Sequence, residues 1–136
     1  MNDDVDLEPG DPAMRFPLQD YLDFEISRGA GRGRCGIERV DDRHGQPHGA
    51  VHGGVVFTIL DTAMGAAATS VLEEGQICAT SDLQIRFLRP AFEGSLTADA
   101  TVVNAGRRLV TVRGDVTDGE GRLIATGTAA FAVLEG

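Results

Sequence analysis

Apolar side chains recur at intervals of three and four residues in the middle of the chain, over residues 53–73. Val56 and Leu60, among others, share one face of a helix with about 3.6 residues per turn, which predicts a helix of about 30 Å. The stretch nearly has the length of a membrane span, but Asp61 at its centre would be costly in hydrocarbon. We therefore expect a buried helix that does not cross a membrane and that ends at Gly75.

Strand-like runs follow this helix, separated by short turns that are rich in glycine. The runs cover residues 77–89, 95–104, 109–118 and 122–134. Leu83, Ile85 and Phe87 alternate with polar side chains, which is the period of a half-buried strand. Because strand follows strand with short connections, we expect an antiparallel meander.

Before the long helix, residues 16–22 favour a short helix that leads into a strand at residues 23–27. A single long helix and a single sheet have to bury their apolar faces against each other. The sequence therefore predicts an α+β fold in which a curved antiparallel β-sheet wraps around one long central helix.

The chain has 136 residues, of which 42% are hydrophobic, and this fits one compact domain. Its formal net charge of -9 argues against nucleic-acid binding, because phosphate contacts need a surplus of basic side chains. Acidic residues gather near the N-terminus, so we expect residues 1–15 to form an acidic, flexible arm and residues 16–136 to form the domain. The first residues lack the basic and apolar segments of a secretory signal, which favours a cytoplasmic protein.

Gly31, Gly33 and Gly36 form a G-x-G-x-x-G pattern, which in dinucleotide-binding proteins follows a strand and opens a helix. Here a strand-like segment follows the pattern, so we expect a glycine-rich turn or bulge instead. Cys35 and Cys78 are far apart and lie in strand-like stretches, which indicates two buried thiols without a disulfide or zinc site.

All three histidines of the chain, His44, His48 and His52, lie in the segment HGQPHGAVHGG with a spacing of four. On a continuous helix they would share one face and could bind a metal ion. The glycines and the proline between them oppose such a helix, so we expect no metal site.

The tripeptide HGG at residues 52–54, an aspartate nine positions after the histidine, and the later stretch DLQIRFLRP resemble the hotdog-fold acyl-CoA thioesterases. The phenylacetate-pathway branch is the most similar, because its pattern HGG…DTA appears here as HGGVVFTILDTAMGAA. The similarity covers residues 36–133. It implies a hotdog fold, hydrolysis of an aryl- or medium-chain acyl-CoA to free acid and CoA, and no cofactor besides the coenzyme A of the substrate.

In that family the active site combines a Gln or Asn six residues before the histidine, the first glycine of HGG, and a carboxylate on the helix. The resemblance therefore implies Gln46, Gly53 and Asp61 as catalytic residues. A carboxylate can activate water or attack the thioester directly, and both roles stay open for Asp61.

Related branches have Ser or Thr four residues after the helix carboxylate, where this chain has Gly65. In the Asp-containing branch a hydroxyl on the next strand assists instead; the offset implies Thr80, with Ser81 as the alternative. We expect His52 to shape the loop ahead of the helix or to transfer a proton. Gln46 would bind the carbonyl or the attacking water, or serve only the structure of its loop.

The first N–H groups of a helix are unpaired and lie at its positive end, so the amides of Gly53 and Gly54 suit a thioester oxygen. Gly53 and Asp61 are eight residues apart, which is about 12 Å along a helix, so they cannot both reach one carbonyl. We expect a homodimer with antiparallel helices, in which each site combines the amide end of one helix with the carboxylate of the other. The resemblance implies a dimer of dimers.

Coenzyme A carries phosphates that need basic side chains, and the candidates are Arg89 at a strand end and Arg107 and Arg108 in a turn. Exposed arginines that only serve solubility are the alternative. The packing of Phe57, Met64, Phe87 and their neighbours should set the size of the acyl pocket.

Asp61 also has a plain structural interpretation, as the cap of a second half of a broken helix or as a solvated side chain. The apolar residues on both sides of it favour a functional carboxylate. Two other functions remain open: a non-catalytic acyl-CoA-binding hotdog module, and a hotdog hydratase or dehydratase.

Overall fold

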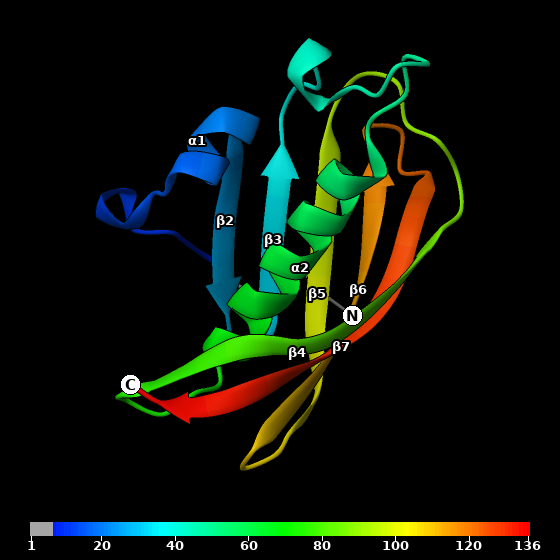
Figure 1. Ribbon diagram of the computed structural model, residues 1–136. Helices are drawn as coiled ribbons and strands as arrows, with labels where there is room; N and C mark the ends of the chain where they lie inside the picture. The colour runs from blue at the N-terminus through cyan, green and yellow to red at the C-terminus, as the bar shows by residue number, and fades with distance from the viewer. Residues whose placement is uncertain (1–6) are drawn as a thin grey trace.

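The computed structural model describes residues 7–136, and one long helix dominates it (Figure 1). The helices are η1 (Pro12–Met14), α1 (Pro17–Leu22), η2 (Asp42–His44) and α2 (Gly53–Thr69), of which η1 and η2 are single 3-10 turns. The strands are β1 (Glu8–Pro9), β2 (Phe24–Gly29), β3 (Arg32–Ile37), β4 (Gln76–Phe87), β5 (Leu96–Ala105), β6 (Leu109–Asp118) and β7 (Leu123–Glu135).

The strands form one antiparallel sheet in the order β1-β2-β3-β5-β6-β7-β4. The sheet bends around α2, and β4 and β7 run across the direction of β2 and β3 (Figure 1). Val56, Leu60 and Ala63 of α2 are buried in the core, on the face that the periodicity predicts. The expected α+β architecture, a curved antiparallel sheet wrapped around one helix, is confirmed, and the sheet is open rather than closed into a barrel.

Glycines on three strands let the sheet approach α2 closely. Gly114 of β6 and Gly127 of β7 are partners in the strand register. A Cβ atom on these two residues would lie 2.9 Å and 3.1 Å from the methyl carbons of Leu60, so the Leu60 side chain fills the space that they leave. On β3, a Cβ atom at Gly33 would lie 2.1 Å from the carbonyl oxygen of Ala63, which only a residue without a side chain permits.

The expected meander is correct for β5, β6 and β7 but wrong for β4. β4 pairs with β7 at the edge of the sheet, whereas β5 pairs with β3. The connection over residues 88–95 crosses the N-terminal end of α2 instead of turning back as a hairpin. It is fixed there by hydrogen bonds from Val51 N–H to the Ala91 carbonyl (2.7 Å) and from Val40 N–H to the Gly94 carbonyl (2.8 Å).

α2 ends at Thr69, earlier than expected, and Gly75 is not its stop. The hydroxyl of Ser70 donates to the Ala67 carbonyl (2.7 Å) and accepts from Gly31 N–H (2.8 Å), so a contact with the β2–β3 turn ends the helix. Gly75, with φ 85°, lies in the turn before β4. Within residues 7–136, no helix is long and apolar enough to cross a membrane.

The predicted N-terminal arm is partly described. Residues 1–6 lie outside the described residues. Glu8 and Pro9 form β1, which pairs with the edge of β2, and Asp11 caps η1. Arg15 donates to Asp20 and Glu25, which ties the end of this segment to α1 and β2. The part over residues 7–15 therefore packs along the sheet, and a domain boundary at residue 16 stays a prediction.

The prediction of a glycine-rich turn is correct only for Gly31, which has a positive φ angle together with Ala30 between β2 and β3. Gly33 and Gly36 lie within β3 in a regular register, and a strand rather than a helix follows the turn. Cys35 is fully buried on β3, and this burial raises the pKa of its thiol. Cys78 is half-buried on β4, and both cysteines are free thiols.

Substitution of Gly33 by alanine should destabilise the fold, because the new methyl group meets the backbone of α2. We expect Gly33→Ala to lower the free energy of unfolding by about 1–3 kcal/mol, the usual cost of overpacking. Gly36→Ala, on the same strand, is the matched control, since its nearest neighbour would be at 3.6 Å. Urea unfolding measures both; equal stabilities of the two variants would contradict the close approach.

Candidate active site

α2 begins at Gly53 because His52 caps it. The Nδ1 atom of His52 accepts a hydrogen bond from Gly54 N–H at 2.7 Å, and its backbone is extended. The Gly54 amide, which we expected to face the substrate, is therefore already engaged. The Gly53 N–H at the first helical position makes no hydrogen bond within residues 7–136, so it is the available donor at this helix end.

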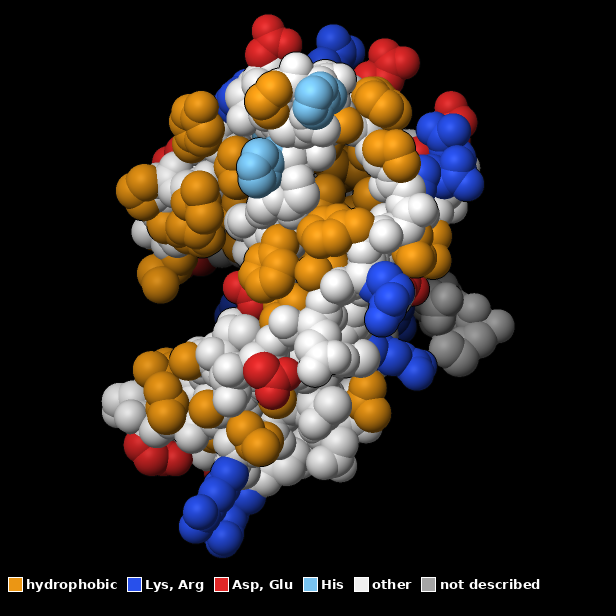
Figure 2. Space-filling model, turned by 45° about the vertical axis from the view of Figure 1, so that its right-hand side comes forward, with side chains coloured by type: hydrophobic (Ala, Val, Ile, Leu, Met, Phe, Trp, Pro, Cys, Tyr) orange, Lys and Arg blue, Asp and Glu red, His pale blue; other side chains and the backbone are white. Residues whose placement is uncertain are grey.

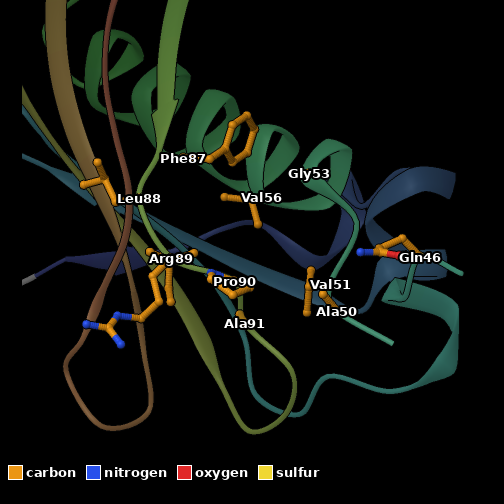
Figure 3. Close-up of a pocket in the computed structure, with 11 residues that line it drawn as sticks. Gln46, Ala50, Val51, Gly53, Val56, Phe87, Leu88, Arg89, Pro90 and Ala91 are labelled. Atoms are coloured by element: carbon orange, nitrogen blue, oxygen red, sulfur yellow. The ribbon is translucent and has the colours of Figure 1, made fainter. Parts of the chain in front are cut away.

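A cleft of about 330 Å³ opens beside Gly53 (Figure 3). Its lining residues are Gln46, Ala50, Val51, Gly53, Val56, Phe87, Leu88, Arg89, Pro90, Ala91 and Ile124. Three of the predicted residues, Gln46, Gly53 and Arg89, thus lie around one cavity whose walls are otherwise mostly apolar. A cleft of this kind suits an apolar group with a polar end.

A tight turn holds Gln46 at this cleft. Its backbone N–H donates to the Ala50 carbonyl (2.8 Å), and its carbonyl accepts from Gly49 N–H (2.9 Å). The side-chain Oε1 accepts from the backbone N–H of His48. The Nε2 group is left to donate, and Figure 3 shows it on the side of Val51.

Asp61 lies two turns of α2 further along, half-buried, where β4 passes the helix. The hydroxyl of Thr80 donates a hydrogen bond to its Oδ1 at 2.8 Å. Of the two hydroxyl candidates, Thr80 and not Ser81 makes this contact. Asp61 sits inside an unbroken helix, so it does not cap a second helical segment.

A β-bulge explains why Thr80 faces the helix. The register of β4 against β7 shifts between Thr80 and Asp82, so Ser81 has no partner residue. Before the bulge, Cys78 packs against the core, and after it Leu83 and Ile85 do. The extra residue changes which positions point inward, and it lets Thr80 face α2 without turning the later apolar side chains outward.

The side of α2 that carries Asp61 is not covered by the sheet. Gly54, Phe57, Asp61 and Gly65 follow one another at intervals of three and four residues, and each is partly or largely exposed. Figure 2 shows hydrophobic side chains in a hollow across the middle of one face of the molecule. Gly53 and Asp61 are separated by about 12 Å along the helix, so one subunit does not bring the amide and the carboxylate together.

The three histidines do not gather into one site. His44 is fully buried, and its ring contacts the Asp41 N–H and the Leu22 carbonyl. His52 caps α2, and His48 is exposed in the turn between them. Among the described residues, no group of three or more His, Cys, Asp or Glu side chains could hold a metal ion.

The predicted arginines lie at two different ends of the molecule. Arg89 follows β4 and lines the cleft. Arg107 and Arg108 form the turn between β5 and β6, at the end of the sheet opposite to Gly53 (Figure 1). One subunit therefore does not join these three side chains into one phosphate site.

Sequence reasoning missed several cleft residues because it misplaced one strand pairing. Leu88 and Ile124 face the same cavity since the Leu88 N–H donates to the Ile124 carbonyl at 2.8 Å, beside the β4–β7 ladder. A meander in chain order does not bring these residues together. Phe87, expected in the acyl pocket, does line the cleft, with its ring 3.4 Å from where a Gly53 Cβ atom would be.

Known proteins are similar to this chain in sequence and in fold. The family model described as Thioesterase superfamily matches residues 48–125. A protein of Halobacterium salinarum, named only provisionally as an esterase, is 40% identical over 81% of this chain and 78% of its own. The crystal structure of thioesterase HI1161 from Haemophilus influenzae superposes with a TM-score of 0.81 at 31% identity, covering 87% of this chain and 82% of that one.

The chain belongs to the Thioesterase superfamily and has its hotdog fold. The E. coli PaaI protein, from the phenylacetic acid degradation operon, is a structural neighbour with a TM-score of 0.78 and 25% identity, covering 88% of this chain and 85% of its own. The relatives place the chain in the superfamily and do not single out the phenylacetate branch.

Loss of the His52 cap should weaken the start of α2. We expect His52→Ala to lower the free energy of unfolding by about 1 kcal/mol, as for other lost N-caps. His52→Asn should keep most of that stability, because an asparagine oxygen can accept from the Gly54 N–H. Urea unfolding of both variants measures the difference, and an unchanged His52→Ala protein would show that the cap contributes nothing.

Proposed function

We propose that the protein is an acyl-CoA thioesterase that hydrolyses aryl- or medium-chain acyl-CoA to the free acid and CoA. The observation that carries this proposal is Asp61, held by the Thr80 hydroxyl on the uncovered side of α2. An aspartate is a poor residue for a helix interior, and Asp61 is partly exposed on the side of α2 that the sheet leaves uncovered, which gives it access to a substrate.

In the proposed reaction, Asp61 takes a proton from a water molecule whose oxygen attacks the thioester carbonyl carbon. The negative charge that develops on the carbonyl oxygen is stabilised by the Gly53 N–H and the Gln46 side chain. The C–S bond then breaks, and the departing thiolate takes a proton. In the alternative route, the Asp61 carboxylate attacks the carbonyl itself, and water hydrolyses the resulting anhydride.

The helix-length argument supports a composite site in a homodimer. β4 is an edge strand of twelve residues, and among the described strands it has a neighbour on one side only. Two copies that pair β4 with β4 about a two-fold axis would set their α2 helices antiparallel. The Gly53 end of one subunit then lies beside Asp61 of the other. Further association into a dimer of dimers rests on the resemblance alone.

The same arrangement offers a place for the coenzyme A phosphates. Arg89 borders the cleft, whereas the Arg107–Arg108 turn lies at the far end of its own subunit. In an antiparallel dimer, that far end approaches the partner's cleft. The three arginines would then serve one substrate from two subunits.

Replacement of the carboxylate should abolish most turnover. We expect Asp61→Asn to lower kcat at least about a hundredfold on phenylacetyl-, hydroxybenzoyl- or straight-chain acyl-CoA, measured as thiol release. Thr80→Val should lower kcat about tenfold, because the carboxylate loses a hydrogen bond. Asp82→Asn, two residues from Thr80 and exposed, is the control.

The outcome also separates the competing functions. If the wild type binds these thioesters but releases no thiol, the protein is a binding module. Hydration of an enoyl-CoA without thiol release would instead indicate a hydratase. If Asp61→Asn keeps full turnover, the assignment of Asp61 is wrong. Single turnover in ¹⁸O-water distinguishes the two routes, since only the nucleophilic route labels Asp61.

Removal of one backbone donor tests the proposed oxyanion site. Proline is tolerated at the first position of a helix, so Gly53→Pro deletes the N–H with little effect on α2. We expect kcat to fall about a hundredfold or more. Gly53→Ala keeps the N–H and adds a methyl group only 3.4 Å from the Phe87 ring, which makes it the matched control. Equal losses in both variants would contradict the role of the amide.

Mixing the two inactive variants tests the composite site. In a dimer of one Asp61→Asn subunit and one Gly53→Pro subunit, one site combines both defects and the other site is intact. Random exchange of subunits should therefore restore about a quarter of the wild-type activity. No recovery, with subunit exchange shown by native mass spectrometry, would place both groups in one subunit.

A further inference from the structure

His44 is the most deeply buried polar side chain among residues 7–136, and the proposed chemistry gives it no role. Its exposed fraction is 0%. Nδ1 accepts a hydrogen bond from Asp41 N–H at 2.9 Å, so Nε2 carries the proton and donates to the Leu22 carbonyl at 2.7 Å. The ring therefore bridges two backbone groups that are far apart in the chain.

The backbone of His44 closes the loop that carries the oxyanion side of the site. Its carbonyl accepts from His52 N–H at 2.8 Å, and Gly45 forms a bridge with Val51. The segment that these two pairs close carries Gln46 near its beginning. Directly after the segment, α2 begins at Gly53. Whatever fixes His44 fixes the base of this loop, which we define as residues 45–52.

Two contacts attach that base to the junction of α1 and β2. One is the buried His44–Leu22 hydrogen bond. The other joins the Arg43 guanidinium to the Tyr21 carbonyl at 3.0 Å and lies at the surface. Water can replace an exposed contact at little cost, whereas loss of the buried one leaves the Leu22 carbonyl without a partner.

We propose that His44 is a positioning residue for thioester hydrolysis, which holds the loop of residues 45–52, and through it Gln46 and the Gly53 N–H, in place against the sheet. This inference rests on the proposed function of the Gly53 end of α2. A hydrogen-bond donor that is misplaced by a fraction of an ångström stabilises the transition state less. Loss of the His44 contacts should therefore lower kcat more than it changes KM.

Two amide substitutions separate the two hydrogen bonds of the ring. A glutamine at position 44 can reach the Leu22 carbonyl with its Nε2 atom. An asparagine can accept from Asp41 N–H but is too short for Leu22. We expect His44→Asn to lower kcat at least about tenfold with KM changed less than about threefold, and His44→Gln to keep most of kcat. All assays run well below the melting temperature of each variant.

Val112→Ala is the stability control, because it removes buried methyl groups from β6 without touching the loop. If Val112→Ala with a similar fall in Tm loses as much kcat as His44→Asn, the role of His44 is only structural and the inference is overturned. Equal kcat values for His44→Asn and His44→Gln would overturn it as well.

Amide hydrogen exchange tests the inference without the reaction. In His44→Asn, the amides of Gln46 and His52 should exchange at least about tenfold faster, while those of β6 stay unchanged. Unchanged exchange in the loop overturns the inference even if the enzyme is active. If the wild type hydrolyses no thioester, the proposed function fails, and faster exchange would still show that His44 holds the loop.

Discussion

A single open sheet cannot surround a helix, and this constraint shapes the whole molecule. Strands β2 to β7 cover the apolar side of α2, where Leu60 fits against the glycine pair of β6 and β7. The remaining side of the helix stays open, with Phe57 and Asp61 on it. The buried side stabilises the fold, and the open side is where the proposed reaction and the proposed second copy of the chain would be accommodated.

Side chains from outside the helix set both ends of α2, and each end connects it to a different part of the sheet. His52 fixes the beginning, close to the cleft, and Ser70 fixes the end through the β2–β3 turn. The helix therefore has a defined length and a defined rotation on the sheet. That rotation decides that Asp61 meets Thr80 of β4.

Features with a local cause could be predicted from the sequence. The spacing of Val56 and Leu60 gave the buried face of the long helix, and alternation in the strands gave their existence. The order of the strands could not be predicted, because the residues of β4 pair with residues 38 to 59 positions later in the chain and no local signal identifies them. The end of α2 at Ser70 depends on Gly31, and the bulge at Ser81 depends on pairing with β7. Both features depend on residues far away in the chain, so the local sequence could not predict them.

The free edge of β4 makes the folded chain prone to aggregation. β4 has twelve residues, and the backbone donors and acceptors on its outer side have no strand partner within residues 7–136. With exposed apolar side chains such as Ile77 and Phe87 beside them, they form a template for unwanted strand addition. Edge strands are often protected from such pairing by charged residues or prolines. In β4 the charged residues are Asp82 and Arg86, and the strand contains no proline. In the proposed dimer, pairing of β4 with its counterpart would cover this edge, so a subunit would be most prone to aggregation before it assembles.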